Sequence, residues 1–466
     1  MSRNKDLIKN TMILSIGQFV PKVMSLIVLP ILTTCLTKFE YGLYDLTLTV
    51  ASFCIPLITL QIQQAVFRFL LETKDNKAEV ITSSFSFLIV MYSFFSIGII
   101  FFWNNYINNF LLSLLFSLSY FVESILSLLG QISRGLGYNI KYSLAYAIYS
   151  ISFMIFLCLK YFLFSYIDLD YLIVSMIISY LISILYLFYT CKIWKYINLK
   201  YNNIFVLKKL IGFSGPMVIS SIALWVVNLS DRFCISAFLG LEMNALYSVA
   251  NKIPNLINSF YSVFNLAWTE NTSKLTLKEK RNGYYTVFFD EFFNFLIGIV
   301  LIIISAMPFI FEILINAKYN QAYGLMSWIF IGVFFSSLVS FLGSIYVGEK
   351  KTKEVGISSI LGAIFNLVIN LLFMKRFGVL VAVFSTIISY FVIFIYRLLD
   401  LKNYIVIEYR KNNIICGILL IVIIALINQY KKSIITVISI VITIFYNLRK
   451  NKKIINVIYN KTFRKE

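Results

Sequence analysis

Charged side chains inside apolar segments are the residues of this sequence best suited to chemistry. Asp231 and Arg232 stand side by side in the stretch NLSDRFCISAFLG, within a long apolar run, and Lys252 and Lys22 also fall inside apolar runs. A charge at the centre of a bilayer costs ~2.5–3.5 kcal/mol on insertion scales, so charges kept there usually face water or a partner. One carboxylate against three cations leaves a positive surplus. This surplus suits an anionic ligand such as a phosphate or pyrophosphate, because Arg binds phosphate oxygens bidentately and Lys acts as a point charge.

The Asp231 carboxylate is expected to lie near Lys252 or Arg232. Asp231 and Lys252 stand at similar distances on either side of a predicted turn at residues 241–243. At ~1.5 Å per residue, both would lie roughly 15 Å from that turn. The alternative is a buried ion pair that only orders the helices.

Two predicted helices carry polar residues at steps of three and four, which places them on one helical face. The stripe in residues 245–270 holds Asn251, Asn255, Asn258, Ser262 and Asn265, and the stripe in residues 45–70 holds Asp45, Thr49, Ser52, Pro56, Thr59 and Gln63. Hydrocarbon offers amides no partners, so the stripes favour a wet cavity. Asn255 and Asn258 are predicted to bind the ligand, and the cavity lining is predicted to include Thr49, Ser52, Gln63, Asn251, Ser262 and Asn265. The alternative is hydrogen bonding that holds helices together.

Other charges within apolar runs have simpler explanations or open roles. Lys160 is close enough to a predicted outer surface to extend its ammonium group into water. Asp290 and Glu291 begin a predicted helix near the cytoplasmic surface, where solvation suffices. Glu123 lies in the middle of its helix, and it either carries a proton or pairs with a cation.

The elements that position these residues are about fourteen apolar helices, so the predicted fold class is an all-α integral membrane protein. The chain of 466 residues is 60% hydrophobic and 13% charged, whereas soluble domains are about 45–50% apolar. The runs are long enough to cross ~30 Å of hydrocarbon, and no signal-peptide cleavage site is evident. The helices are predicted at residues 8–36, 45–70, 80–102, 110–132, 142–164, 171–190, 210–240, 245–270, 286–313, 321–347, 355–374, 378–398, 413–428 and 434–448.

Basic residues predict the orientation of these helices. An even number of helices puts both termini on one side, and with the termini inside, the outer loops carry only Lys38, Lys318, Lys375, Arg376, Lys431 and Lys432. The other loop cations then lie inside, which predicts cytoplasmic termini. No loop is long enough to fold as a domain, so any chemistry is expected inside the helical bundle.

Composition also narrows the classes of partner and cofactor. The net charge is +20, and there are six cysteines and no histidine. The basic residues lie mostly in short loops, as topology signals do, so no nucleic acid partner is expected. Scattered cysteines without a CxxC pair indicate neither a disulfide framework nor a zinc site, and we expect no metal and no cofactor. Without histidine, carboxylates are the candidate proton carriers, and a coupling ion, proton or sodium, stays open.

An internal repeat predicts the domain organisation. LTKFEYGLYDL (36–46) follows the first predicted helix, and LGLEMNALYSV (239–249) follows the seventh. We predict two pseudo-symmetric six-helix lobes at residues 1–200 and 201–400, followed by two extra helices and a basic cytoplasmic tail at 401–466. Prolines bend helices, and the first two helices of each lobe hold Pro21, Pro30, Pro56, Pro216 and Pro254. These prolines are predicted hinges, and static kinks are the alternative.

Two stretches resemble the oligosaccharide flippases of the polysaccharide-transport family, within the multidrug/oligosaccharidyl-lipid/polysaccharide exporter superfamily. The first is LIKNTMILSIGQFVPKVMSLIVLPILTTCLTKFEYGLYDL, with FEYG at residues 39–42. The second is NLSDRFCISAFLG…LYSVANKIPNLINSFYSVFNLAWTE at residues 228–270, which contains Asp231, Arg232 and Lys252. The resemblance covers the first twelve predicted helices, and the last two match only as hydrophobic segments.

The resemblance implies a fold of two six-helix lobes around a central cavity, and a function in O-antigen or capsule synthesis. Such a protein moves an undecaprenyl-pyrophosphate-linked oligosaccharide from the inner to the outer leaflet of the bacterial plasma membrane by alternating access. Its cavity cations would be Lys22, Arg232 and Lys252, with Asp231 as their partner. Trp225 and Trp268 are candidates for stacking on sugars, and packing is the alternative for both. We expect a monomer in the lipid bilayer, with polymerase and chain-length machinery as further candidate partners.

Two other functions compete with this one. A multidrug cation antiporter of the same fold should prefer an acidic or apolar cavity, whereas the charges here are mostly positive. An integral-membrane polysaccharide polymerase usually places catalytic residues in a sizeable external loop, which this sequence lacks. The sugar composition of the substrate is not predicted.

Overall fold

Helices joined by turns and loops make up the part of the chain that the structure describes. The computed structural model describes residues 2–71, 76–275, 283–349, 351–405, 407–429, 433–452 and 456. Within them, ten helical segments are long and apolar enough to cross a membrane. The chain is therefore an all-helical, multi-pass membrane protein, as predicted, while the finer count of fourteen membrane spans stays a prediction.

Contacts divide the chain into two compact units, Met1–Phe233 and Cys234–Glu466. The division falls inside the helix α8 (Ile204–Leu239). The predicted lobe boundaries at residues 200 and 400 follow the sequence repeat and stay predictions.

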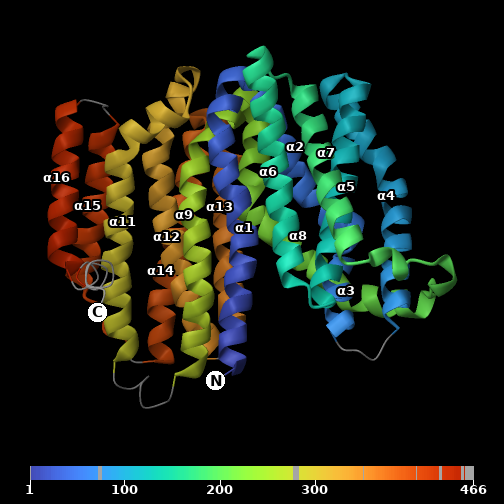
Figure 1. The fold of residues 1–466 in the computed structure, drawn as a ribbon. Helices are drawn as coiled ribbons and strands as arrows, with labels where there is room; N and C mark the ends of the chain where they lie inside the picture. Colours follow the sequence, from blue (N-terminus) through green and yellow to red (C-terminus); the bar gives the residue numbers. More distant parts are fainter. Residues whose placement is uncertain are drawn as a thin grey trace, which may run out of the picture. The chain divides into compact units, whose positions relative to one another are not determined.

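Unit 1 is built around α5, which contacts α2, α3, α4, α6 and α7. Its polar interior includes the buried Trp103, whose indole N–H donates to the Tyr120 hydroxyl at 3.2 Å, and Tyr120 donates onward to the Thr47 carbonyl at 2.9 Å. Besides most of α8, unit 1 contains α1 (Ser2–Cys35), α2 (Lys38–Thr59), α3 (Ile62–Leu71), α4 (Lys77–Ile107), α5 (Phe110–Gly135), α6 (Asn139–Phe164), α7 (Leu169–Thr190), η1 (Ile193–Lys195) and η2 (Leu199–Tyr201) (Figure 1).

Unit 2 is built around α12, which contacts α9, α11, α13, α14 and α15. After the end of α8 it contains α9 (Leu241–Lys274), α11 (Tyr284–Leu314), η3 (Ala317–Tyr319), α12 (Asn320–Gly348), α13 (Thr352–Phe377), α14 (Leu380–Asp400), η4 (Leu401–Asn403), α15 (Lys411–Asn428) and α16 (Ser433–Lys450).

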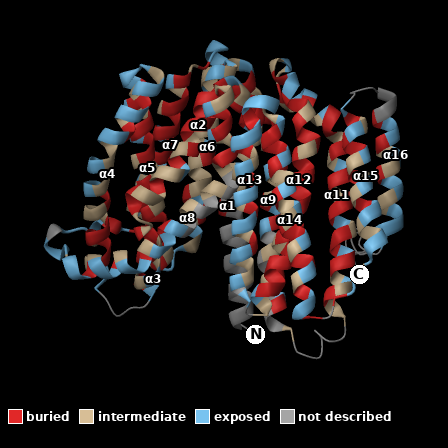
Figure 2. Cartoon of the chain, turned by 180° about the vertical axis from the view of Figure 1, so that it is seen from behind, coloured by how far each residue is buried: buried red, intermediate tan, exposed pale blue. Residues whose placement is uncertain are grey.

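Burial separates the central helices from those that face outward. In the most apolar window of the α12 segment, 83% of residues are buried, against 11% in α4 and in α6. Figure 2 shows the same contrast, with buried residues along α12 and exposed residues along α4. A helix that is apolar all round fits either a core or a lipid environment, so hydropathy alone does not separate α12 from α4.

The predicted helix at residues 45–70 is wrong as a single element. The structure ends α2 at Thr59 and begins α3 at Ile62. Leu60 and Gln61 between them have φ angles of 43° and 55°, in the left-handed region. Every other predicted span overlaps one helix of the described chain.

The two turns of the predicted repeat join helices in the expected places and are capped differently. At α2, the Thr37 hydroxyl and the Glu40 carboxylate form a capping box: Glu40 N–H donates to Thr37 Oγ1 at 3.2 Å, and Thr37 N–H donates to Glu40 Oε2 at 2.8 Å. At α9, Gly240 at φ 90° begins the helix without a side-chain cap. The shared positions Leu43 and Leu246 are buried in both units, as are Tyr44 and Tyr247.

Candidate functional site

Arg232 forms a buried ion pair across unit 1. Its Nη1 lies 2.8 Å from Oδ1 of Asp45, and the side chains are 15% and 1% exposed. Asp45 of α2 is thus a partner of Arg232, and the predicted proximity of Asp231 to Lys252 or Arg232 stays a prediction. Asp231, the residue before Arg232, is also buried.

Asp45 is the residue that sequence reasoning missed as part of the site. It begins the polar stripe of α2, and 187 positions separate it from Arg232, so its role depends on tertiary structure. Adding its carboxylate lowers the cation surplus of the predicted site by one. The remaining surplus is still positive.

The Arg232–Asp45 pair lies at one end of a set of contacts between α8 and α2, here called the α2/α8 seam. The Trp225 indole N–H donates to the Thr49 carbonyl at 3.0 Å, and its ring centroid lies 4.9 Å from that of Phe53. Positions four and seven apart share a helical face, which places Ser221, Trp225 and Arg232 together on α8. The seam comprises Asp45, Thr49, Phe53, Gln61, Ser221, Trp225 and Arg232.

The break between α2 and α3 supplies the other end of the seam. Gln61 Nε2 donates to Ser221 Oγ at 2.9 Å, and Gln63 Nε2 donates to Gln61 Oε1 at 3.1 Å. A non-glycine residue held in the left-handed region costs of order 1–3 kcal/mol and persists where its surroundings fix it. No glycine or proline marks this break in the sequence, and the only signal is the glutamine-rich QIQQ at residues 61–64.

The predicted cavity-lining residues of α2 differ in exposure. Thr49 and Gln63 are buried, whereas Ser52 is exposed. Lys22 on α1 is also exposed. Among the residues of the predicted site in unit 1, Ser52 and Lys22 are therefore the exposed ones.

The residues of the polar stripe of α9 have two kinds of surroundings in unit 2: some contact α12 and others are exposed. Asn258 accepts from Ser336 of α12 at 3.3 Å, and Asn265 accepts from Ser344 of α12 at 2.9 Å. These two amides therefore join helices, which is the alternative that the sequence left open. Asn255 and Ser262 are exposed, and they stay candidates for ligand contact.

Two more candidates on α9 lie near the start of its stripe. Asn251 Nδ2 donates to the Tyr247 carbonyl one turn earlier at 2.8 Å, and Asn251 and Lys252 are both half-buried. Their predicted roles stay predictions.

Trp268 is a packing residue rather than a platform for sugars. Its ring lies parallel to Phe288 and Phe341, at centroid distances of 4.3 and 4.7 Å, and it is 3% exposed. Its indole N–H donates to the Phe341 carbonyl at 3.1 Å. Both the ring and its polar atom are thus occupied by protein.

Glu123 on α5 lies in a cluster of tyrosines from neighbouring helices of unit 1. Tyr180 of α7 lies beside its carboxyl group, and Tyr149 of α6 stacks on Tyr180 at a centroid distance of 4.2 Å. Tyr44 of α2 adds its hydroxyl to the same surroundings. The Glu123 carboxyl group thus lies among tyrosine side chains of three helices.

The remaining predictions concern helix ends and prolines. Lys160 lies near the end of α6, with its Nζ 4.0 Å from Asp168 Oδ1, as expected for a lysine that reaches the surface. The helices continue through the predicted hinges, Pro21 and Pro30 in α1, Pro56 in α2, Pro216 in α8 and Pro254 in α9. Hinge motion stays a prediction.

Comparison with known sequences supports the predicted resemblance. Residues 7–269 match a family described as polysaccharide biosynthesis protein. An uncharacterised membrane protein of Methanocaldococcus jannaschii is 25% identical over 193 residues, which are 41% of this chain and 36% of that protein. The matched region thus spans little more than a third of that relative's length.

Solved structures share the fold over most of the chain. The lipid II flippase MurJ, in an inward closed conformation, has a TM-score of 0.70 at 16% identity and covers 97% of this chain and 99% of its own. An inward-facing MATE family multidrug resistance transporter has a TM-score of 0.62 at 12% identity, covering 84% and 95%. A MOP superfamily transporter from Pyrococcus furiosus has a TM-score of 0.57 at 13% identity, covering 85% and 95%.

These comparisons agree with the two stretches that carry the resemblance, which is thereby confirmed. The family match covers more than half of the chain, and at these identities the solved structures establish the fold. This protein belongs to the polysaccharide biosynthesis protein family and has the fold of the MOP superfamily transporters.

Proposed function

We propose that this protein is a flippase for a lipid-linked oligosaccharide in a bacterial plasma membrane. The cargo is an undecaprenyl-pyrophosphate-linked repeat unit of a surface polysaccharide, carried from the inner to the outer leaflet by alternating access. The family and the fold shared with a lipid II flippase support this class of cargo. Both termini would then be cytoplasmic, as the charge pattern predicts.

The observation that carries the proposal is the surroundings of Arg232. A guanidinium has five N–H donors, and among the described side chains Asp45 Oδ1 takes only one hydrogen bond from it. Asp45 thus holds the guanidinium in place, and four donors remain. Two parallel N–H groups match two phosphate oxygens, so Arg232 can bind a diphosphate without leaving Asp45.

Exposed polar groups in each of the two units support a sugar-bearing cargo. Ser52, Asn255 and Ser262 are exposed and offer hydroxyl and amide groups to sugar hydroxyls. Trp225 keeps a half-buried ring beside Phe53, which gives an aromatic face near Arg232 on α8. Lys22 and Lys252 are the further candidate cations.

The ion pair decides how the proposal is tested. Arg232→Ala would leave the Asp45 carboxylate buried without this cation, and loss of one partner of a buried pair is itself destabilising. The neutral pair Arg232→Gln with Asp45→Asn keeps a hydrogen bond while it removes the positive charge. Lys252→Ala and Lys22→Ala remove the other cations, and the exposed Lys200→Ala is the matched control.

The experiment is complementation of a deletion strain. We expect the wild type and Lys200→Ala to restore surface polysaccharide. Arg232→Gln with Asp45→Asn and Lys252→Ala should each abolish display at normal protein abundance, and lipid-linked repeat units should accumulate in the membrane. Normal display in both would refute the role of these cations. Loss of display without such accumulation would point to a different step, such as synthesis of the lipid-linked unit.

The Glu123 cluster favours a second candidate, a multidrug cation antiporter of the same fold. A carboxylate among aromatic rings suits an organic cation, because ring faces and the carboxylate both attract positive charge. A drug-efflux assay with Glu123→Gln tests this. The antiporter would be favoured if drug efflux is lost in Glu123→Gln and if the deletion strain displays as much surface polysaccharide as its parent strain.

A further inference from the structure

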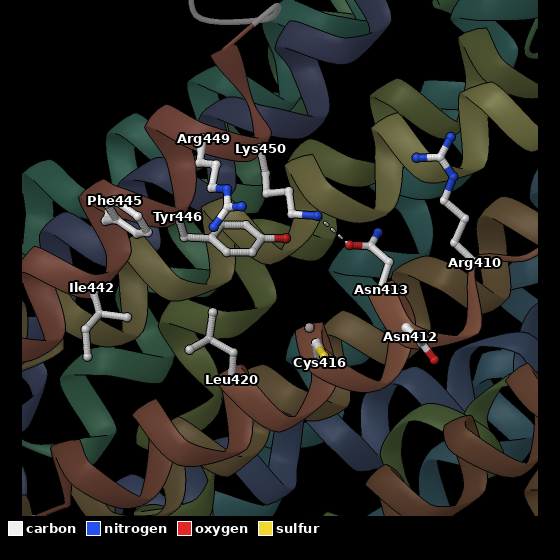
Figure 3. A pocket seen from close by; sticks show the side chains of 11 residues that line it. Arg410, Asn412, Asn413, Cys416, Leu420, Ile442, Phe445, Tyr446, Arg449 and Lys450 are labelled. Atoms are coloured by element: carbon white, nitrogen blue, oxygen red, sulfur yellow. Dashed lines mark hydrogen bonds between the residues drawn. The ribbon is translucent and has the colours of Figure 1, made fainter.

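The last two helices form a pocket that the proposed transport does not use. A cavity of about 650 Å³ lies between α15 and α16 in unit 2, which is within the ~300–1,000 Å³ typical of ligand sites. One part of its lining is apolar, with Leu420, Ile442 and Phe445. Another part is basic, with Arg410, Arg449 and Lys450. Figure 3 shows Leu420 and Ile442 on the side of the pocket away from Arg410.

The basic part is held in place by polar contacts with α11. Tyr446 OH and Asn413 Nδ2 both donate to Asn294 Oδ1, at 3.0 and 3.2 Å. Lys450 Nζ donates to Asn413 Oδ1 at 3.0 Å, the dashed contact in Figure 3. The start of α15 and the end of α16 are thus fixed against α11.

The charges at this end do not cancel. Arg410 Nε lies 3.0 Å from Asp290 Oδ2, so this pair is neutral, although the Arg410 side chain remains 79% exposed. Arg449 and Lys450 form the last turn of α16, and no carboxylate forms an ion pair with either of them among the described residues. Asp290, which also lies near Lys450, is one carboxylate against three cations, so the basic part of the pocket keeps a net excess of two positive charges beside an apolar wall.

The position of the pocket in the membrane follows from the predicted orientation. With both termini inside, the start of α11, the start of α15 and the end of α16 all face the cytoplasm, and the contacts above bring these three ends together. The cytoplasmic leaflet is anionic, and basic pockets between transmembrane helices on that side bind anionic headgroups.

We propose that this pocket is a binding site for a resident acidic glycerophospholipid such as phosphatidylglycerol. Arg449 and Lys450 bind the headgroup phosphate, with Arg410 at the rim. An acyl chain lies along Leu420, Ile442 and Phe445. The complementarity of two charges with an anionic headgroup, and of an apolar wall with a chain, selects a lipid over a free phosphate ion.

Cys416 offers a reporter inside the pocket, because it lines the cavity and is exposed. The other five cysteines are replaced by alanine, and Cys416 carries a bimane fluorophore in the purified full-length protein. Phosphatidylglycerol or phosphatidylcholine with brominated acyl chains is then titrated, and bromine quenches the fluorophore on contact. The test variant is Arg449→Gln with Lys450→Gln. The matched control is Lys375→Gln with Arg376→Gln, a basic pair in the last turn of α13 outside the pocket.

Each cation near an anionic lipid surface contributes about fivefold to binding. The wild type and the control should therefore be quenched by the phosphatidylglycerol at concentrations about 25-fold lower than by the phosphatidylcholine. The test variant should lose this preference. Equal quenching of the wild type by both lipids, or a preference that survives in the test variant, would overturn the proposal.

Two competitors separate the sources of the phosphate group. Inorganic phosphate at millimolar concentration should leave the quenching unchanged, and release of the lipid by it would instead assign a free anion site. Undecaprenyl phosphate should compete no better than unbrominated phosphatidylglycerol. Preferential displacement by it would overturn the assignment to a phospholipid, while the proposed transport would still be tested separately by complementation.

Discussion

Two arginines lie inside helical segments of the two units, and they meet different surroundings. Arg397 of α14 is 2% exposed. Its Nη1 donates to the Val339 carbonyl at 2.6 Å, and its Nε donates to Ser358 Oγ at 3.0 Å. Its Nη2 donates to the Val355 carbonyl and to Ser359 Oγ, both at 3.2 Å. Arg232 in unit 1 contacts one carboxylate and is more exposed.

The difference separates a structural arginine from one that can bind a ligand. Arg397 uses its donors on α12 and α13, so it joins three helices and has little capacity for another acceptor. Arg232 is oriented by a single acceptor and keeps donors for phosphate oxygens. Burial alone does not distinguish these roles, whereas the number of protein acceptors does.

The largest expected effect is on stability, from Arg397→Met. The change leaves buried acceptors without a charged donor, and each such loss costs about 1–3 kcal/mol. We expect the free energy of unfolding to fall by about 3 kcal/mol or more, with little protein in the membrane fraction. Thermal unfolding in detergent measures this. Arg232→Gln with Asp45→Asn is the comparison, and an equal loss in both variants would contradict the distinction between the arginines.

A smaller effect is expected when space beside Arg397 is filled. A Cβ at Gly343 would lie 2.7 Å from Arg397 Nη1, whereas a Cβ at Gly324 on the same helix has nothing within 4 Å. Overpacking costs ~1–3 kcal/mol, and replacing a helical glycine returns up to ~1 kcal/mol. We expect Gly343→Ala to lower the unfolding temperature and Gly324→Ala to raise it. The same shift in both variants would show that Arg397 is free to move.

Arg232→Lys tests the use of the guanidinium in transport. Lysine keeps the positive charge but lacks the planar fork that binds two oxygens. Because one charge-assisted hydrogen bond is worth about 1.5–3 kcal/mol, we expect the rate of polysaccharide display to fall at least about tenfold, with abundance close to the wild type. A display rate equal to the wild type would mean that only the charge at Arg232 matters.

The smallest expected effect extends the comparison to the asparagines of α9. Asn265 accepts from Tyr261 and Ser344, while Asn255 is exposed. Asn265→Ala should cost about 1–2 kcal/mol of unfolding free energy, because it leaves hydroxyl donors without this acceptor. Asn255→Ala should leave stability unchanged and slow display instead. If Asn255→Ala instead lowered stability and Asn265→Ala slowed display without lowering it, the different roles given to these two asparagines would be contradicted.

Hydropathy was enough to predict all but one of the long helices, because a bilayer demands long apolar helices whatever their partners. The orientation that the basic loops predict stays a prediction. Hydropathy could not predict the break at Leu60 and Gln61, since these residues carry no turn signal and the Ser221 hydroxyl that accepts from Gln61 lies 160 positions away in the sequence. It also could not show that α12 is central and α4 peripheral, because both are apolar.

Sequence reasoning also found only some residues of the candidate site, because it does not show which helices pack together. Arg232 was found because a charged residue inside an apolar run can be recognised from the sequence alone. Its partner Asp45 lies in another helix, and sequence position alone favoured the adjacent Asp231. The spacing of Asn258 and Asn265 correctly predicted a helix. The serines of α12 that donate hydrogen bonds to these two amides are far away in the sequence, so the contacts could not be predicted.

The most direct test of the account is ligand binding by the purified protein. A short-chain polyprenyl pyrophosphate is titrated against the wild type, Arg232→Gln with Asp45→Asn, and the Lys200→Ala control. The account predicts that Arg232→Gln with Asp45→Asn binds about 10–100-fold more weakly than the wild type, which corresponds to the loss of one or more charge-assisted hydrogen bonds. Lys200→Ala should bind as the wild type does. Equal affinity in all three proteins would contradict it.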